Sequence, residues 1–170
     1  MKKLFLLLFL FFTFSCDDGD FNISSFEFED TVNMCITDIY TLYRLSDNGH
    51  KEALIVTLTD DQIKNSIEPV LPVNVTETGT YTVTDRIFND EVTKSYFCSI
   101  IPPTTPKVTK DWRGVSGTIE VINKAVLDEN EIDTIAYEHV IILHDVVLKS
   151  GEESLIFNDT YLFGSFQTGI

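Results

Sequence analysis

Three cysteines and one Trp-Arg pair are the residues whose types and spacing most clearly suggest chemistry. Cys16 follows a run of Leu and Phe and one small residue, whereas Cys35 and Cys98 lie in the body of the chain. A thiol can be acylated, oxidised to a disulfide or left free, so the surroundings of each cysteine decide its role. Trp112 and Arg113 are adjacent, and a flat ring beside a guanidinium suits stacking on a ligand, although a Trp partly buried at a sheet end would look the same.

The residues before Cys16 have the order of an export signal. Met1-Lys2-Lys3 is basic, Leu4 to Phe14 is almost entirely Leu and Phe, and Ser15 is small. An apolar run of about eleven residues is too short for a membrane-spanning helix, which needs roughly 20. We therefore expect residues 1–15 to be a signal peptide.

A Cys directly after that small residue resembles the lipobox of bacterial lipoproteins, with Thr13 where the box usually has Leu. The resemblance implies a diacylglyceryl group on Cys16, cleavage before it, and acylation of the new amino terminus by a fatty acid such as palmitate. Two or more acyl chains give stable attachment where one gives only marginal binding. The expected partner of Cys16 is therefore a lipid bilayer. A secretory signal that ends in a chance Cys is the alternative.

The segment after Cys16 bears on which membrane face is occupied. Asp17-Asp18-Gly19-Asp20 is acidic and resembles the surface-export signal of Bacteroidota-type lipoproteins. This resemblance implies a lipid anchor in the outer membrane with the domain at the cell surface. In enterobacterial-type lipoproteins an Asp at this place would instead imply retention at the inner membrane, so an anchored domain facing the periplasm stays open. We expect residues 16–24 to form an acidic tether. The alternative, a calcium site, is less well supported, because three carboxylates supply too few ligands for calcium.

Charge excludes one class of partner. The chain has 12 basic and 27 acidic side chains, and the signal contains two of the basic ones and no acid, which leaves a net charge of −17 after cleavage. Nucleic-acid binding depends on Lys and Arg releasing counterions from phosphates. We therefore expect no nucleic-acid partner.

Cys35 and Cys98 form an even pair in a chain predicted to reach an oxidising compartment, so we expect a disulfide between them. By loop entropy such a bridge would stabilise the fold by about 4 kcal/mol. The alternative is two buried thiols in neighbouring strands.

The residues that could support catalysis or metal binding are few. His139 and His144 lie five residues apart in one predicted strand and should point to opposite faces, so they should not share a metal. His50 lies beside an Asn-Gly turn. The sequence contains no Gly-x-Ser-x-Gly, His-Glu-x-x-His or phosphate-binding Gly loop. We expect no metal, no cofactor and no enzymatic activity.

Period-two alternation and turn signals predict strands through residues 25–170. The expected strands are Ser25–Asp30, Met34–Leu45, Ala53–Leu58, Gly79–Thr84, Val92–Ile101, Val115–Leu127, Ile132–Lys149, Ser154–Phe157 and Tyr161–Phe166. The tip Asp128-Glu129-Asn130-Glu131 should place Leu127 near Ile132, and the long strand after it should contain a bulge near His139 to His144.

One short helix is expected between these strands. Thr59-Asp60-Asp61-Gln62 matches a capping box, which predicts a helix to about Ile67, before Pro69. Asp60 and Asp61 suit the helix amino terminus better than a catalytic pair. Pro102, Pro103 and Pro106 should make a stiff connector.

These elements predict a single all-β domain at residues 25–170, an antiparallel β-sandwich. Tyr96-Phe97-Cys98 and the distance from Cys35 resemble an immunoglobulin domain in architecture at most, since Trp112 follows the second Cys. Cys16-Asp17-Asp18-Gly19-Asp20 with Ser95 to Pro106 resembles uncharacterised Flavobacteria-type surface lipoproteins, a resemblance that implies no activity.

Two functions of different classes fit this sequence. The first is a surface-exposed binding or adhesion module that presents Asp47 to Lys51 and the Trp112-Arg113 region to a glycan or protein. The second is an envelope structural or assembly component whose partner is another outer-membrane protein. Asp30-Thr31-Val32 and Asp133-Thr134-Ile135 also resemble the O-glycosylation site of Bacteroidota-type exported proteins.

Overall fold

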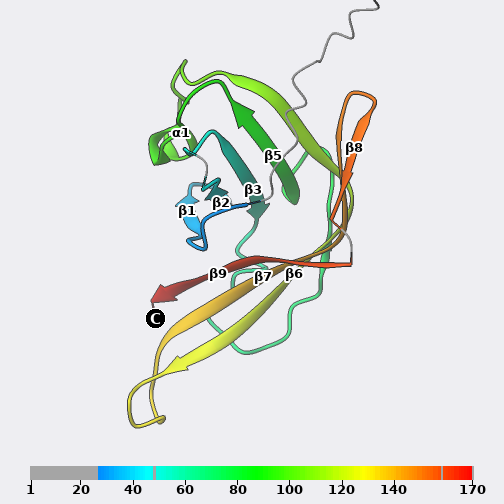
Figure 1. Ribbon diagram of the computed structural model, residues 1–170. Helices are drawn as coiled ribbons and strands as arrows, with labels where there is room; N and C mark the ends of the chain where they lie inside the picture. The colour runs from blue at the N-terminus through cyan, green and yellow to red at the C-terminus, as the bar shows by residue number, and fades with distance from the viewer. Residues whose placement is uncertain (1–26, 48, 158, 170) are drawn as a thin grey trace, which may run out of the picture.

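The computed structural model describes residues 27–47, 49–157 and 159–169, and these form one antiparallel sheet with one short helix. The strands are β1 (Asn33–Ile36), β2 (Tyr40–Leu45), β3 (Glu52–Leu58), β4 (Val73–Asn74), β5 (Thr82–Phe88), β6 (Val108–Leu127), β7 (Thr134–Ser150), β8 (Glu153–Ile156) and β9 (Thr160–Gly169), and the helix is α1 (Lys94–Cys98). The predicted all-β, antiparallel, sandwich-like domain with one short helix is confirmed (Figure 1). The signal peptide, Cys16 and the tether lie outside the described residues.

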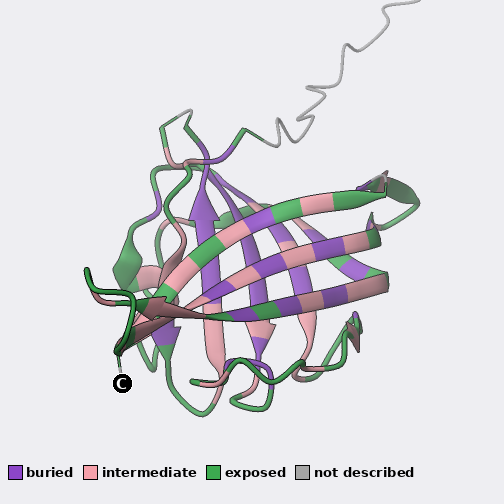
Figure 2. Cartoon of the chain, turned by 90° about the horizontal axis from the view of Figure 1, so that it is seen from below, coloured by how far each residue is buried: buried purple, intermediate pink, exposed green. Residues whose placement is uncertain are grey.

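The sheet is a meander that bends over itself. Its order is β1-β2-β3-β5-β6-β7-β8, with β4 beside β6 and β9 beside β7. The strands β2, β3 and β5 form one layer, and β6, β7 and β9 cross it as the other (Figure 2). Because one sheet supplies both layers, the architecture is sandwich-like without the two separate sheets of an immunoglobulin domain.

The two longest strands make the bend. β6 pairs with β5 through Arg113 and with β7 from there to its end, and its register shifts between Gly114 and Thr118. Gly117 has φ +107° at this bend, and a Cβ there would lie 2.6 Å from Cα of Val146. Only glycine fits so close an approach at that backbone angle. Between the pairs Ser116–Val147 and Thr118–His144, β7 has one residue more than β6, and Asp145 there has φ 50°, which confirms the bulge predicted near His139 to His144. On its other side, the register shift between Ile141 and Ile142 places the extra residue, Phe163, in β9.

The main core lies between the two layers. It contains the largest apolar side chains that face inward from both layers, with the aromatic rings of Phe28, Trp112, Phe157 and Phe163 among them. Leu42 of β2 and Leu54 of β3 are fully buried there. Burial of this kind contributes about 1.5–3 kcal/mol for each large side chain.

A second core covers the outer face of β2 and β3. Tyr43, Ala53 and Ile55 alternate with the inward residues, and α1 packs over them with Tyr96 and Phe97. The rings of Tyr43 and Phe97 stack with centroids 4.1 Å apart. The unbroken apolar run of β3 is therefore buried on both faces, as such runs usually are.

Three predicted elements are wrong. The described part of the expected strand Ser25–Asp30 forms only an isolated bridge, between Phe28 and Ser46. Residues 59–67 form turns in place of the predicted helix: the N–H of Gln62 donates to the carbonyl of Thr59 at 3.0 Å, so the capping signal closes a single turn that does not propagate. The predicted strand Val92–Ile101 is instead the helix α1 with flanking loops. Tyr96 and Phe97 of this helix pack on the outer face of β2 and β3, so tertiary packing overrides the local strand preference of the segment.

Strand boundaries and one register also differ from the expectation. Met34–Leu45 is two strands, β1 and β2, joined by a tight turn. At the tip of the β6–β7 hairpin, Leu127 pairs with Thr134 and not with Ile132. The carboxylate of Asp128 causes this, because it accepts hydrogen bonds from the N–H groups of Ile132 and Asp133 and so builds a wider turn.

Candidate functional site

The structure pairs Cys35 of β1 with Cys98 of α1 as a disulfide, with Cα atoms 5.3 Å apart. The predicted pairing therefore agrees with the structure, but its place differs from that in an immunoglobulin domain. The disulfide fastens a surface helix to an edge strand, whereas the bridge of an immunoglobulin domain joins its two sheets. The helix has five residues, and none of them is fully buried, so the disulfide and the aromatic stack hold it in place.

Trp112 does not occupy a position from which it could contact a ligand. Its side chain is only 4% exposed and forms part of the main core, and Lys110 lies over its ring with Nζ 4.5 Å from the centroid. The predicted role of Trp112 as a contact is therefore corrected, because both the burial and the Lys110 ammonium remove the ring from solvent. The alternative was a Trp partly buried at a sheet end; the structure buries Trp112 more fully, within β6 and in the main core.

Arg113 is exposed but already engaged. Its Nε donates to Asp111 at 2.9 Å, and Asp111 also accepts from Nε of Arg86 at 2.8 Å. Partial burial would raise the pKa of Asp111, but the hydrogen bonds from the two guanidinium groups outweigh it and lower the pKa. Arg113 is thus half of an ion pair on the sheet surface, and nothing brings it together with the Trp112 ring as a joint stacking site.

The histidines of β7 belong to two separate cross-strand networks. His139 is fully buried, with its ring nitrogens 2.6 Å from Asn123 Oδ1 and 2.8 Å from Thr168 Oγ1, and burial lowers its pKa. His144 is partly exposed, with Nε2 2.7 Å from Glu120 Oε2 and Nδ1 3.3 Å from Thr160 Oγ1. Strand register alone makes these side chains neighbours.

His50 lies elsewhere, at the turn between β2 and β3. Its Nε2 is 2.6 Å from Glu29 Oε1, and this hydrogen bond raises the pKa of the imidazole. Across the described ranges, no group of three His, Cys, Asp or Glu side chains is placed to hold a metal ion.

Sequence reasoning missed a buried arginine. Arg44 faces the interior, and its three guanidinium nitrogens donate to the carbonyls of Glu29 at 2.6 Å, Phe28 at 2.9 Å and Phe163 at 2.9 Å. It joins the amino-terminal segment to the last strand. Gly164 lies beside it, where a Cβ would meet Val32 at 2.6 Å. The sequence signal for this buried Arg was its place in a mostly apolar strand. An Arg in such a strand is rarely buried unless its charge is paired or hydrogen-bonded.

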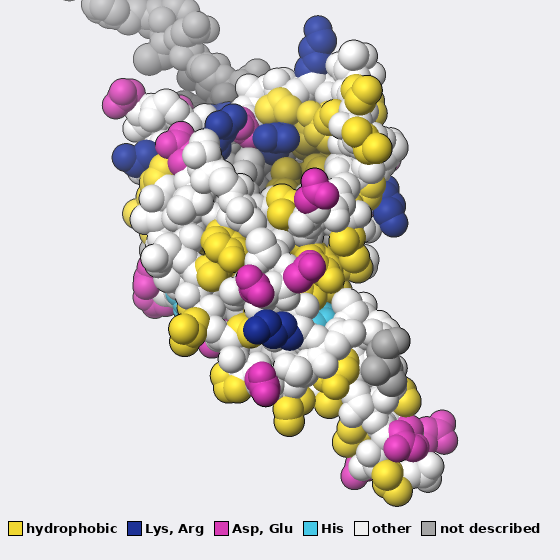
Figure 3. Space-filling model, turned by 180° about the vertical axis from the view of Figure 1, so that it is seen from behind, with side chains coloured by type: hydrophobic (Ala, Val, Ile, Leu, Met, Phe, Trp, Pro, Cys, Tyr) yellow, Lys and Arg dark blue, Asp and Glu magenta, His cyan; other side chains and the backbone are white. Residues whose placement is uncertain are grey.

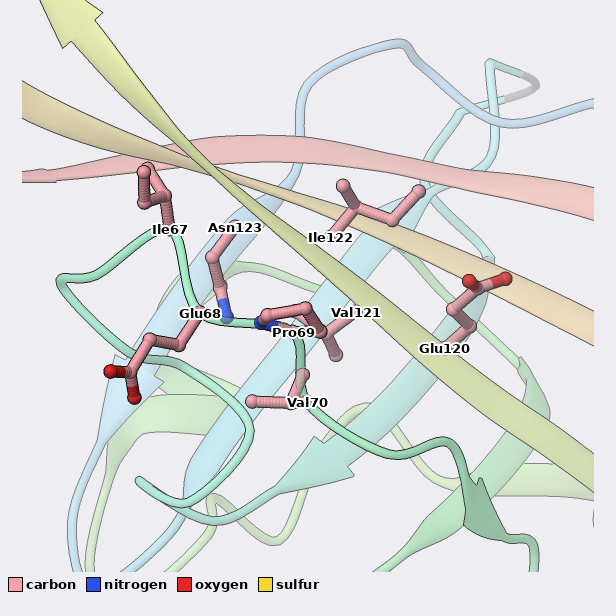
Figure 4. A pocket seen from close by; sticks show the side chains of 8 residues that line it. All are labelled: Ile67, Glu68, Pro69, Val70, Glu120, Val121, Ile122 and Asn123. Atoms are coloured by element: carbon pink, nitrogen blue, oxygen red, sulfur yellow. The ribbon is translucent and has the colours of Figure 1, made fainter.

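The described surface is hollowed between the loop after β3 and the strand β6. The hollow has a volume of about 260 Å³ and is lined by Ile67, Glu68, Pro69 and Val70 of the loop and by Glu120, Val121, Ile122 and Asn123 of the strand (Figure 4). Small-molecule sites usually measure roughly 300–1,000 Å³. This hollow therefore suits a few side chains of a larger partner better than a whole small molecule.

Apolar side chains are exposed around this hollow. Ile67 is 71% exposed and Leu71 83% exposed, and Ile122 contributes from β6. Farther along, the β6–β7 hairpin projects from the body of the domain, with Leu127, Ile132 and Ile135 exposed near its tip (Figures 1 and 3). Contiguous exposed apolar surface with a polar rim is typical of a protein interaction site. We therefore take this hollow and the β6 strand beside it as the candidate site.

No protein-family model, curated protein or solved structure matches the chain. Within the part that the structure describes, no helix has the length and apolar character needed to cross a bilayer.

Proposed function

We propose that the protein is a lipid-anchored binding module of the outer membrane, held by acylated Cys16 and displayed at the cell surface, and that its partner is a protein. The β domain is a scaffold for this role, and the candidate site is the surface that meets the partner. The observation that carries the proposal is the apolar surface that Ile67, Leu71 and Ile122 expose around the hollow.

A protein partner has more support than a glycan. Sugar rings bind on exposed aromatic faces, and the ring of Trp112 is buried beneath Lys110. The apolar side chains around the hollow are aliphatic, and aliphatic side chains bury favourably against another protein surface. An adhesion role toward a protein and an assembly role toward an envelope protein would both use this surface.

We also propose that the role is not enzymatic. Thr160, His144 and Glu120 follow one another in hydrogen-bond order, as a nucleophile, a base and an orienting acid would. His144 pairs directly with Thr160 and is the diagonal neighbour of Glu120, so a surface ladder of polar side chains explains the arrangement without catalysis.

The address is tested by protease treatment of intact cells that produce the full chain or its Cys16→Ser variant. We expect external protease to digest the wild-type domain and the variant to leave the membrane fraction. Thr13→Leu is the matched control, because it restores the usual lipobox residue and should keep the anchor. If protease added to intact cells leaves the wild-type domain undigested, surface display is excluded. If the Cys16→Ser variant stays in the membrane fraction, the lipid anchor is excluded.

The binding role is tested by chemical crosslinking on intact cells followed by purification of the anchored chain. We expect one envelope or extracellular protein in stoichiometric amount, and we expect Ile67→Glu with Leu71→Glu to abolish its recovery. The exposed pair Lys94→Glu and Lys107→Glu, at α1 and just before β6 and away from the apolar patch, serves as the control. Recovery that the Ile67 and Leu71 changes leave intact would exclude the candidate site.

A further inference from the structure

The strand β6 has an edge that the sheet leaves open. Its first part pairs with β5 as far as Arg113, and Thr118 and Ile119 pair with β4. From Glu120 to Leu127 the described residues pair with β6 on one side only, through β7. This open edge faces the hollow beside Ile67 to Val70 (Figure 4).

The backbone groups that face this edge follow from strand geometry. In an antiparallel strand, the N–H and C=O of one residue point to the same edge, and residues two apart share that edge. The N–H of Val75 donates to the carbonyl of Gly117 at 2.9 Å, so Gly117 faces the β4 side, and Ile119 pairs with Val73 in the same register. Val121, Asn123 and Ala125 therefore direct their N–H and C=O groups to the open edge.

Such an edge is a template for another strand. An extended segment that pairs with it gains main-chain hydrogen bonds, and its alternate side chains fill neighbouring pockets. Folded proteins usually protect an exposed edge with a charge, a proline or a covering loop. Here the loop at Ile67 to Val70 leaves the hollow beside the edge, which gives room for the side chains of an added strand. Val121 and Asn123 are only 3% and 9% exposed, so an added strand would have to displace part of this loop to reach their main-chain groups.

The charge around the open edge of β6 indicates which charged side chains an added segment would carry. The eight residues that line the hollow include Glu68 and Glu120 and no Lys or Arg. The hairpin tip beyond the edge adds Asp128, Glu129, Glu131 and Asp133, and Figure 3 shows acidic side chains gathered at the end of the projecting arm. One basic side chain, Lys124, lies on the edge itself. A segment with basic side chains is attracted here, whereas a second copy of this acidic chain is repelled.

We infer that the edge of β6 from Glu120 to Leu127 is a strand-addition site for an extended segment of another protein, in which apolar and basic residues alternate. The inference rests on the proposed binding role and names the kind of segment that the partner presents. The apolar residues enter the hollow beside Ile67 and Val70, and the basic residues lie toward Glu68 and the acidic tip.

The probe that tests this is a short capped peptide of alternating Val and Lys, added to the full chain in detergent. We expect amide hydrogen exchange at Val121, Asn123 and Ala125 to slow by about tenfold when the peptide is in excess. The same peptide N-methylated at the residues that face β6 is the control, because it keeps the side chains and cannot complete the ladder. Equal binding of both peptides, or protection at another strand, would overturn the site.

A variant pair tests the same point from the side of the protein. Ala125→Pro removes one N–H from the open edge and no hydrogen bond to β7, a position at which strands tolerate proline, and Ala125→Val keeps the N–H. We expect binding of the Val-Lys peptide to be lost in the first and kept in the second. The N-methylated peptide remains decisive if the proline variant does not fold.

Two further results separate the occupants. Glu68→Gln should weaken binding of the Val-Lys peptide by about two- to fivefold, and an alternating Val-Glu peptide should not bind. If exchange at Ala125 slows with protein concentration alone, the occupant is a second copy and the inferred partner is wrong. If Ala125→Pro still recovers the crosslinked partner from cells, the strand-addition site fails while the binding role stands. If no partner is recovered from wild-type cells, the binding role itself fails.

Discussion

Replacing both Cys35 and Cys98 with Ala should lower the free energy of unfolding by about 4 kcal/mol. The disulfide closes a loop between residues 63 apart in sequence, and the entropy that such a loop removes from the unfolded chain amounts to about 4 kcal/mol at 25 °C. Domains of this size unfold with roughly 5–15 kcal/mol. The bridge therefore contributes a large share of the total.

The loss should be greatest around α1. A five-residue helix is too short to form alone, and no residue of α1 is fully buried. Without the bridge, only packing such as the Tyr43–Phe97 stack holds the helix to the sheet. We therefore expect amide exchange in α1 to reach that of an unfolded segment while exchange in β3 stays slow.

Urea unfolding of the oxidised wild type and the double variant measures the difference. The Phe97→Leu variant, with the bridge intact, is the control that isolates the packing of the ring and should cost about 1–2 kcal/mol. A loss below about 1 kcal/mol in the double variant would refute the loop argument. Equal exchange of α1 in wild type and double variant would refute the claim that the bridge holds the helix.

Four further outcomes are expected. Arg44→Met should cost about 3 kcal/mol in urea unfolding because three carbonyls lose their donor, and a loss under 1 kcal/mol would contradict that. Tyr43→Phe should leave the free energy of unfolding unchanged or raise it, since the buried hydroxyl has no hydrogen-bond partner among the described residues; clear destabilisation would reveal such a partner. Gly164→Ala should lower the free energy of unfolding in urea by about 1–3 kcal/mol, because φ is +135° and a Cβ would meet Val32. Since the hydrogen bond to Glu29 raises the folded pKa of His50, the stability that His50→Gln removes should be largest below pH 6.5 and vanish as pH rises through the raised pKa; a difference that does not vary with pH would contradict this assignment.

The sequence was sufficient where local pattern and burial agree. The expected strand Ala53–Leu58 is β3, which begins one residue earlier, and the expected strand Ser154–Phe157 is β8, displaced by one residue. The long strand β7 also contains a bulge next to His144, as its length required. In each case, turn chemistry and side-chain alternation point to the same structure.

The sequence failed where tertiary packing overrode a local signal. Thr59 to Gln62 has the side chains of a helix cap. The residues after it have no apolar face that a helix could bury, so the chain forms a loop instead. The segment around Phe97 alternates too weakly to show that it covers a sheet face. The unbroken apolar run of β3 was the signal that something must cover it.

The candidate site depends on which strand edge is left open. That edge is determined by pairing between strands that are far apart in the sequence. Nothing local distinguishes Val121 of the open edge from Ile119 beside β4. Only the arrangement of the whole sheet shows it.

Arg44 also determines how the domain would respond to being pulled. The segment at Phe28 and Glu29 is where the chain enters the fold from its amino end, and the guanidinium fastens it to Phe163 of the last strand. Tension applied through the amino terminus would therefore load these three contacts, together with the backbone hydrogen bonds of Glu27 and Glu29 to Asp47 and Leu45, before it reached the rest of the meander. Under such tension the contacts of the Arg44 side chain with three carbonyls would be among the first to break, and the strands of the meander would separate afterwards.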